Sequence, residues 1–140
     1  MSKATVIEIG EAITEKIRTI EGAENVSFDL VLDFPLPHIR ELKIIVAPQS
    51  YTRGNKGAAS RENPDEAVKF NIAILKKCSG ATEIPDMLLL TETIAKGIER
   101  QIISRGIVTQ VEFDPLYDAE NFRTMKVFVA VCTATVKVLR

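Results

Sequence analysis

Apolar residues recur at helical spacing in two stretches of the chain. Near the N-terminus, five aliphatic residues follow one another at steps of three or four: Val6, Ile9, Ile13, Ile17 and Ile20. A second stripe begins after Pro85, a residue that suits the first turn of a helix: Met87, Leu90, Ile94, Ile98 and Ile102. The spacing predicts one helix over residues 5–20 and a second from Pro85 to Arg105, with Gly106 ending it.

Alternation of apolar and polar residues predicts strands elsewhere. We expect three strands between the helices, over residues 26–34, 42–47 and 68–75, the first two ended by prolines. Two more strands, residues 107–113 and 124–139, form a long C-terminal hairpin around a turn region. The order α-β-β-β-α-β-β predicts an α+β fold: a mostly antiparallel sheet with two helices packed on one face. With 140 residues and no repeat or linker, residues 1–140 form a single domain.

The last expected strand is unusual in its length and in having two apolar faces. Sixteen extended residues span about 50 Å at roughly 3.3 Å per residue, so the strand must bend, bulge or project. Two helices cover only one face of a small sheet well, and the second face is then best covered by a neighbouring subunit. The hairpin therefore supplies the candidate subunit-interface residues Leu116, Tyr117, Phe122, Val127, Val129 and Val131.

Residues 49–66 form a long connection rich in glycine and small polar residues. We expect a flexible loop, because little apolar surface offsets the entropy of ordering it. Its candidate contact residues are Tyr51, Arg53, Lys56 and Arg61. They suit contact with phosphates or with an acidic partner surface. The alternative interpretation is an ordinary solvated loop.

Charge and composition exclude several classes of protein. Lys and Arg number 18 against 19 Asp and Glu, a net charge of -1, so a domain-wide basic field for nucleic acid is absent. With 2 Cys and 1 His, the chain cannot make a common zinc site, and no cofactor motif is present. We expect the two cysteines, Cys78 and Cys132, to be free buried thiols. The N-terminal pattern is amphipathic and no apolar run of about 18 residues occurs, which predicts a soluble cytoplasmic product without a membrane partner.

Candidate catalytic residues are isolated. His38 lacks an accompanying nucleophile motif, and we interpret it as a turn residue. Glu112, Asp114 and Asp118 could share a cation, but they fit turn roles better. Cys78 follows two lysines at a strand end, without a partner base. The sequence thus predicts no catalytic residue, no metal site and no enzymatic activity.

The order of elements and several local patterns resemble a family. These patterns are strands ending at Val46-Ala47-Pro48, a polar loop to Ser60-Arg61, a strand over Val68 to Ile74, a helix from Leu88 to Ile98, and a hairpin with Asp114-Pro115-Leu116-Tyr117-Asp118. Together they resemble the small tail-completion and tail-terminator proteins of long-tailed bacteriophages and prophages. The resemblance covers almost the whole chain but includes no diagnostic motif.

The resemblance implies a structural virion protein without cofactors. Such a protein forms a ring, expected to be a hexamer, at the head-proximal end of the tail, where it ends tail-tube polymerisation and provides the head-joining surface. Its partners would be further copies of itself, the tail tube protein and the head connector, with DNA passing through the lumen. It would be located in the virion tail after assembly in the host cytoplasm. Two alternatives stay open: a head-closure or adaptor protein of the neck, and a small oligomeric α+β ligand-binding protein or enzyme with a polar pocket.

Overall fold

The computed structural model describes residues 4–33, 36–53, 66–113 and 116–139. Within these ranges the chain forms helices and strands in an order close to the one predicted. The elements are α1 (Thr5–Arg18), β1 (Val26–Phe28), η1 (Leu36–His38), β2 (Lys43–Thr52), β3 (Ala67–Lys77), η3 (Ala81–Glu83), α2 (Ile84–Ile98), β4 (Ile102–Ile103), β5 (Gly106–Phe113), α3 (Ala119–Met125) and β6 (Val127–Val138).

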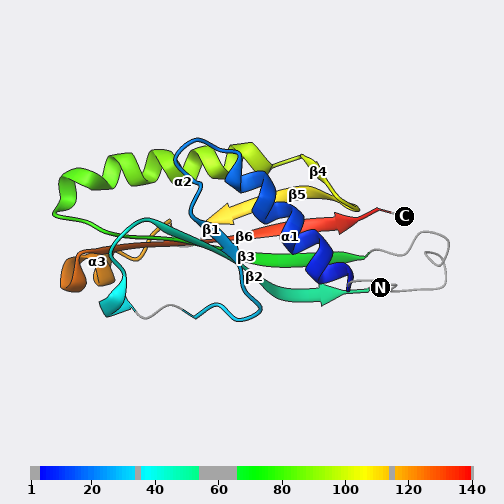
Figure 1. Ribbon diagram of the computed structural model, residues 1–140, viewed down its shortest axis with the longest axis horizontal. Coiled ribbons are helices and arrows are strands. Elements are labelled where there is room, and N and C mark those ends of the chain that lie inside the picture. Colours follow the sequence, from blue (N-terminus) through cyan, green and yellow to red (C-terminus); the bar gives the residue numbers. More distant parts are fainter. Residues whose placement is uncertain (1–3, 34–35, 54–65, 114–115, 140) are drawn as a thin grey trace.

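The described strands build one six-stranded sheet in the order β1-β2-β3-β6-β5-β4. The β1–β2 pair is parallel, and the other neighbouring strands are antiparallel. The helices α1 and α2 lie on the same face of this sheet (Figure 1). The predicted α+β class, with two helices on one face of a mostly antiparallel sheet, is therefore confirmed.

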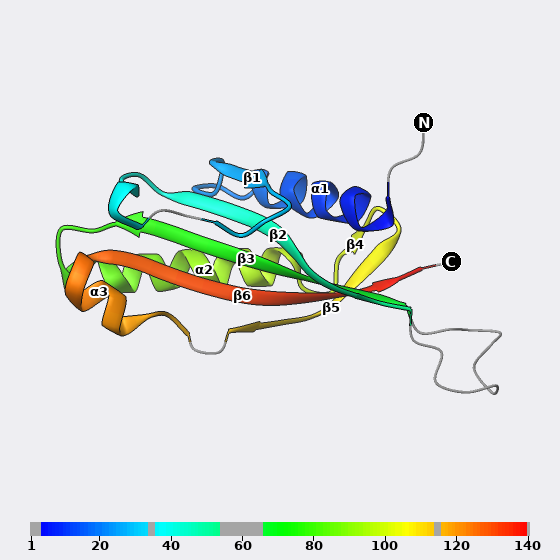
Figure 2. The same ribbon diagram turned by 90° about the horizontal axis from the view of Figure 1, so that it is seen from below.

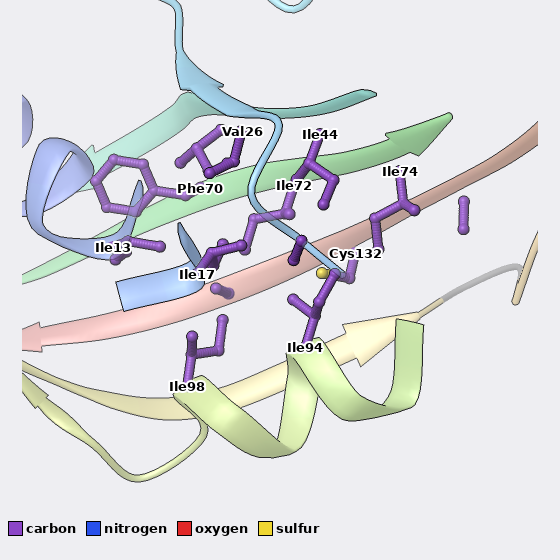
Figure 3. Close-up of a cluster of buried hydrophobic side chains, with 14 of the residues drawn as sticks. Ile13, Ile17, Val26, Ile44, Phe70, Ile72, Ile74, Ile94, Ile98 and Cys132 are labelled. Carbon is purple, nitrogen blue, oxygen red and sulfur yellow. The ribbon is translucent and has the colours of Figure 1, made fainter. Parts of the chain in front are cut away.

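The main core lies between the sheet and the two long helices (Figure 3). Side chains of α1 and α2 meet alternate residues of the central strands, and all of the following are fully buried: Ile13, Ile17, Ile94, Ile98, Phe70, Ile72, Ile74 and Cys132. At Gly10 the Phe28 ring leaves no room for a Cβ atom, so this glycine allows α1 to approach β1 closely. The predicted helical stripes are thus the surfaces that the sheet covers.

A second, smaller core lies on the opposite face of the sheet, at one end. Its buried members are Ile39, Ile45, Ala73, Leu75, Val127 and Val129, with Leu32, Met125 and Val131 packed against them. The connection between β1 and β2 supplies Leu32 and Ile39, and α3 supplies Met125. In Figure 2 the β1–β2 connection lies over this face, and α3 lies beside the start of β6. The chain itself therefore covers this end of the second face, where the sequence led us to expect a neighbouring subunit.

The first two strands differ from the expected ones for local reasons. β1 ends at Phe28 instead of residue 34: the Asp29 N–H still donates to the Val46 carbonyl at 2.9 Å, and the chain then bends away from the sheet. β2 continues past Pro48 to Thr52, with a register shift between Pro48 and Ser50. Because β1 pairs only with residues 44–46, Pro48 lies at an open edge that needs no N–H donor.

The second helix is shorter than its apolar stripe. α2 ends at Ile98, and its C-cap Glu99 is extended instead of helical. Arg100 and Ser104 then adopt left-handed conformations, with φ of 64° and 55°. Between them Ile102, which we expected on the buried stripe, lies in β4 with 71% of its surface exposed.

The predicted turn before the last strand contains the short helix α3. The Asp118 carboxylate caps it by accepting from the Asn121 N–H at 3.0 Å, and Lys126 ends it at a φ of 59°. β6 consequently begins at Val127 instead of Thr124. It pairs with β3 along residues 127–137 and with β5 along residues 132–138. The last strand therefore does not project; it lies in the middle of the sheet.

Candidate functional site

The second face of the sheet changes from apolar to polar along the strands. Beyond the second core, cross-strand neighbours on this face form three rows. The first row is Asn71, Thr133 and Glu112, beside the buried Ala47 of β2. The second is Ser50, Lys69, Thr135 and Gln110, and the third is Thr52, Ala67, Lys137 and Ile107. We call these residues the open half-face, because neither α3 nor the β1–β2 connection lies over them (Figure 2).

The open half-face combines hydroxyl and amide groups with cations. Lys69 and Lys137 are exposed, and among the described residues neither is in an ion pair. Arg53 follows β2 at the same end of the sheet and is exposed as well. Glu112 is the single acidic side chain in the three rows. This surface therefore has a positive balance in a chain whose net charge is -1.

The expected flexible loop begins later than the sequence suggested. Residues 49–52 belong to β2, and the Tyr51 hydroxyl donates to the carboxylate of the buried Glu66. Glu66 also accepts the Val138 N–H on its carbonyl at 2.8 Å, so this contact ties the end of β2 to β3 and β6. Lys56 and Arg61, with residues 54–65, lie outside the described residues.

The candidate interface residues of the hairpin occupy different environments. Phe122, Val127 and Val129 are buried within the chain, and the Tyr117 ring stacks on Phe128 at 5.4 Å between centroids. Val131 is half-buried, and Leu116 is 50% exposed. Burial of the two valines removes the argument that a neighbouring subunit must cover them. The predicted interface now rests on Leu116.

Leu116 lies at a groove between α2 and β5. The groove has a volume of about 300 Å³. Its apolar lining consists of Leu88, Ala95, Val111, Phe113 and Leu116, and its polar lining of Thr91, Glu92 and Lys96. No sequence pattern indicates this α2–β5 groove, because the groove depends on how α2 crosses the sheet.

A second apolar feature lies at the opposite edge of the sheet. Leu30 and Val31 come after β1 and Asp29, and they are 63% and 72% exposed. The alternation predicts both within a strand over residues 26–34, with Leu30 on its apolar face, but the chain leaves the sheet at Asp29 and both side chains lie at the surface. The two side chains together form a small exposed apolar surface at this edge.

The perturbed titratable groups have structural explanations. The N–H and hydroxyl of Ser79 donate to Glu83 at 2.6 and 2.7 Å, and with Lys76 they lower the pKa of this carboxylate to about 2. Cys78 and Cys132 are free thiols, as predicted. Burial raises the pKa of both, for Cys132 to about 12, so neither is a ready nucleophile at neutral pH.

The other candidate residues are dispersed. His38 is exposed beside an open hollow that it shares with Asn25, Arg40, Glu41 and Lys43. Asp118 caps α3, Glu112 lies on the open half-face, and Asp114 falls outside the described residues. The described part of the chain brings no three His, Cys, Asp or Glu side chains together as metal ligands. None of its helices has the length and apolar character needed to cross a bilayer.

Comparison with known proteins identifies a structural relative. No family model matches the sequence, and no curated protein matches it either. Among solved structures, the fold is similar to a chain from the "Virion of native gene transfer agent (GTA) particle", with a TM-score of 0.58 and 15% identity. The match covers 97% of this chain and 99% of that chain. At this identity, the likeness establishes a common α+β fold over the full length of both chains.

Proposed function

We propose that the protein is a structural component of a phage-like virion. The observation that carries this proposal is the fold shared with a chain of the gene transfer agent particle, which leaves almost no part of either chain unmatched. The order of elements independently resembles the tail-terminator proteins of long-tailed phages. Both lines of reasoning lead to the same kind of particle.

Within such a particle, we assign the protein to the head-proximal end of the tail. There it forms a ring that ends polymerisation of the tail tube and provides the surface for head joining. Two opposite sheet edges with apolar surface suit contacts between like subunits in a ring. The open half-face, with Lys69 and Lys137, suits the lining of a lumen through which DNA passes. Lysine contacts to phosphates carry no information about the bases, so such a lining suits DNA of any sequence.

The titratable groups favour an assembly role over catalysis. The lowered pKa of Glu83 comes from hydrogen bonds that fix the turn between β3 and α2, and the raised pKa values of the cysteines come from burial. Active sites instead place perturbed groups together in a pocket. The α2–β5 groove contains Glu92 and Lys96, whose side chains are 68% and 77% exposed. Exposed charges beside apolar side chains suit a surface that contacts another protein more than a catalytic pocket.

The experiment is removal of the gene from the virus or prophage that encodes it, followed by electron microscopy of the tails. A tail terminator predicts tail tubes of uncontrolled length and heads without tails, because nothing stops polymerisation. Complementation with the wild-type gene restores a single tail length. Tails of normal length that fail to join heads would instead identify a neck protein, and normal particles would contradict both roles.

A further inference from the structure

We propose that the protein assembles head-to-tail, with residues 29–33 of one copy seated in the α2–β5 groove of the next copy. We call this segment the 29–33 bend. The inference rests on the proposed ring and names the two surfaces that join its subunits. The occupant of the groove is thus a second copy of the same chain.

The 29–33 bend presents two apolar side chains from a fixed backbone. Leu30 and Val31 project into solvent, whereas the residues on either side are anchored. On one side, the Asp29 N–H donates to the Val46 carbonyl at 2.9 Å; on the other, Leu32 packs against the second core. An anchored bend loses little conformational entropy on binding, which favours a contact of this size.

The groove offers apolar surface next to an open strand edge. β4 pairs only with Gly106 and Ile107, and the N–H and C=O of Val108 are bonded to residues 101 and 100. Beyond Val108, no described strand pairs with the outer edge of β5. On β6 the Val138 N–H donates to Glu66 on the β3 side, so alternation directs the backbone groups of Thr133 towards β5 and those of its partner Glu112 inward. The backbone groups of Val111 and Phe113 therefore face outward. An extended segment in the groove can therefore also hydrogen-bond to β5.

The sheet register places the two surfaces at the same level on opposite edges. Paired residues run straight across the five strands in the order Phe28, Val46, Ile72, Cys132, Phe113. Phe28 directly precedes the bend, and Phe113 lines the groove. A contact between two different edges of like subunits is heterologous, so it repeats from copy to copy and closes into a ring when the rotation permits.

One pair of charges at the rims is complementary, although Glu92 adds a negative charge beside Lys96 at the groove. Asp29 and Asp33 flank the apolar pair of the bend, and Lys96 lies at the rim of the groove. Lys96 Nζ is 3.8 Å from Glu92 Oε1, with both side chains more than two-thirds exposed. Such an exposed pair contributes little, so Lys96 can turn to an aspartate of the next copy. An apolar centre with a charged rim is the usual anatomy of a protein interface.

Cysteine cross-linking between separately purified variants tests the contact. Val31→Cys and Leu116→Cys are mixed at high concentration and oxidised with copper phenanthroline, and disulfide-linked dimers are counted on non-reducing gels. We expect a mixed dimer in high yield. The matched control replaces Leu116→Cys by Leu89→Cys, which is 63% exposed on α2 but does not line the groove. The buried native thiols give the background in the wild-type chain.

A charge substitution gives a second readout. Val31→Asp, which lies on the surface and leaves the fold intact, should lower the association constant about tenfold or more and abolish the mixed dimer. If the Val31→Cys and Leu116→Cys pair cross-links no better than the pair with the Leu89→Cys control, the proposed contact is wrong. The ring role would still stand if the chain is required for tails of defined length. If the pair cross-links strongly but removal of the gene leaves the tails normal, the contact is supported and the ring role is refuted.

Discussion

Replacing Cys132 with Asp is expected to unfold the protein. Cys132 is fully buried in the middle of β6, between Ile72 of β3 and Phe113 of β5, beneath α2. A carboxylate there would lose its hydration without gaining a cation, because the surrounding core is apolar. An uncompensated buried charge costs roughly 3–5 kcal/mol or more, a large part of the about 5–15 kcal/mol that stabilises a typical domain.

The measurement is urea denaturation followed by circular dichroism. Thr135→Asp is the matched control, because Thr135 lies on the same strand, faces the open half-face and pairs with Lys69 and Gln110. We expect this control to lose no more than about 1 kcal/mol, within the range of ordinary point mutants. A Cys132→Asp variant as stable as the Thr135→Asp variant would show that the helices do not cover this face of the sheet.

Replacing Phe122 with Ala is expected to cost about 3–5 kcal/mol of unfolding free energy, the usual loss for truncating a buried aromatic ring. Phe122 is 6% exposed and is the buried residue of α3. The Phe122 ring packs into the main core and so anchors this short helix. The Lys126 ammonium lies 5.9 Å from the centroid of the Phe122 ring. A helix of seven residues has little stability of its own, so loss of the ring should release α3.

The control is Arg123→Ala, at the next position of α3, where the side chain is 73% exposed. We expect a change within about 0.5 kcal/mol, because the ion pair of Arg123 with Glu120 is on the surface. Equal stability of the two variants would contradict the packing of α3. For the same reason we expect deletion of residues 116–122 to destabilise the subunit itself, because the deletion removes both Phe122 and Tyr117 from the main core.

The apolar pattern predicted the helices and the central strands because each of these elements buries one face against the main core, and that face carries the apolar residues. The stripes of α1 and α2 and the alternation in β3 and β6 each match the main core. Alternation could not show that the chain leaves the sheet at Asp29, since Leu32 continues the same pattern while serving the second core. Nor could it show α3, where a single buried ring and the Asp118 cap hold a helix too short to form a stripe.

The candidate site was predictable only in part. Lys69, Thr133 and Thr135 stand at alternate positions of strands β3 and β6, so a polar half-face was already implicit in the pattern. The α2–β5 groove was not, because it depends on the place where α2 ends and on the unpaired edge of β5. Surfaces formed by the crossing of elements far apart in the chain have no local sequence signal.

The fold suits a subunit that is stable alone and joins others at its edges. The central strands β3 and β6 pair along nearly their whole lengths, and the two cores cover most of one face and one end of the other. Apolar side chains remain exposed at both edges, at Leu30, Val31 and Leu116, and also elsewhere, at Leu89 on α2 and Ile102 in β4. Assembly through these edges would leave the open half-face of every subunit free.

The most direct measurement of the proposed role is cryo-electron microscopy of purified tail tubes mixed with the purified protein. The tube protein must come from the same virus or prophage. From the proposed role we expect a closed ring of this chain on one end of each tube and no further elongation when tube protein is added. Tubes that bind no ring, and that elongate equally fast with and without the protein, would contradict it.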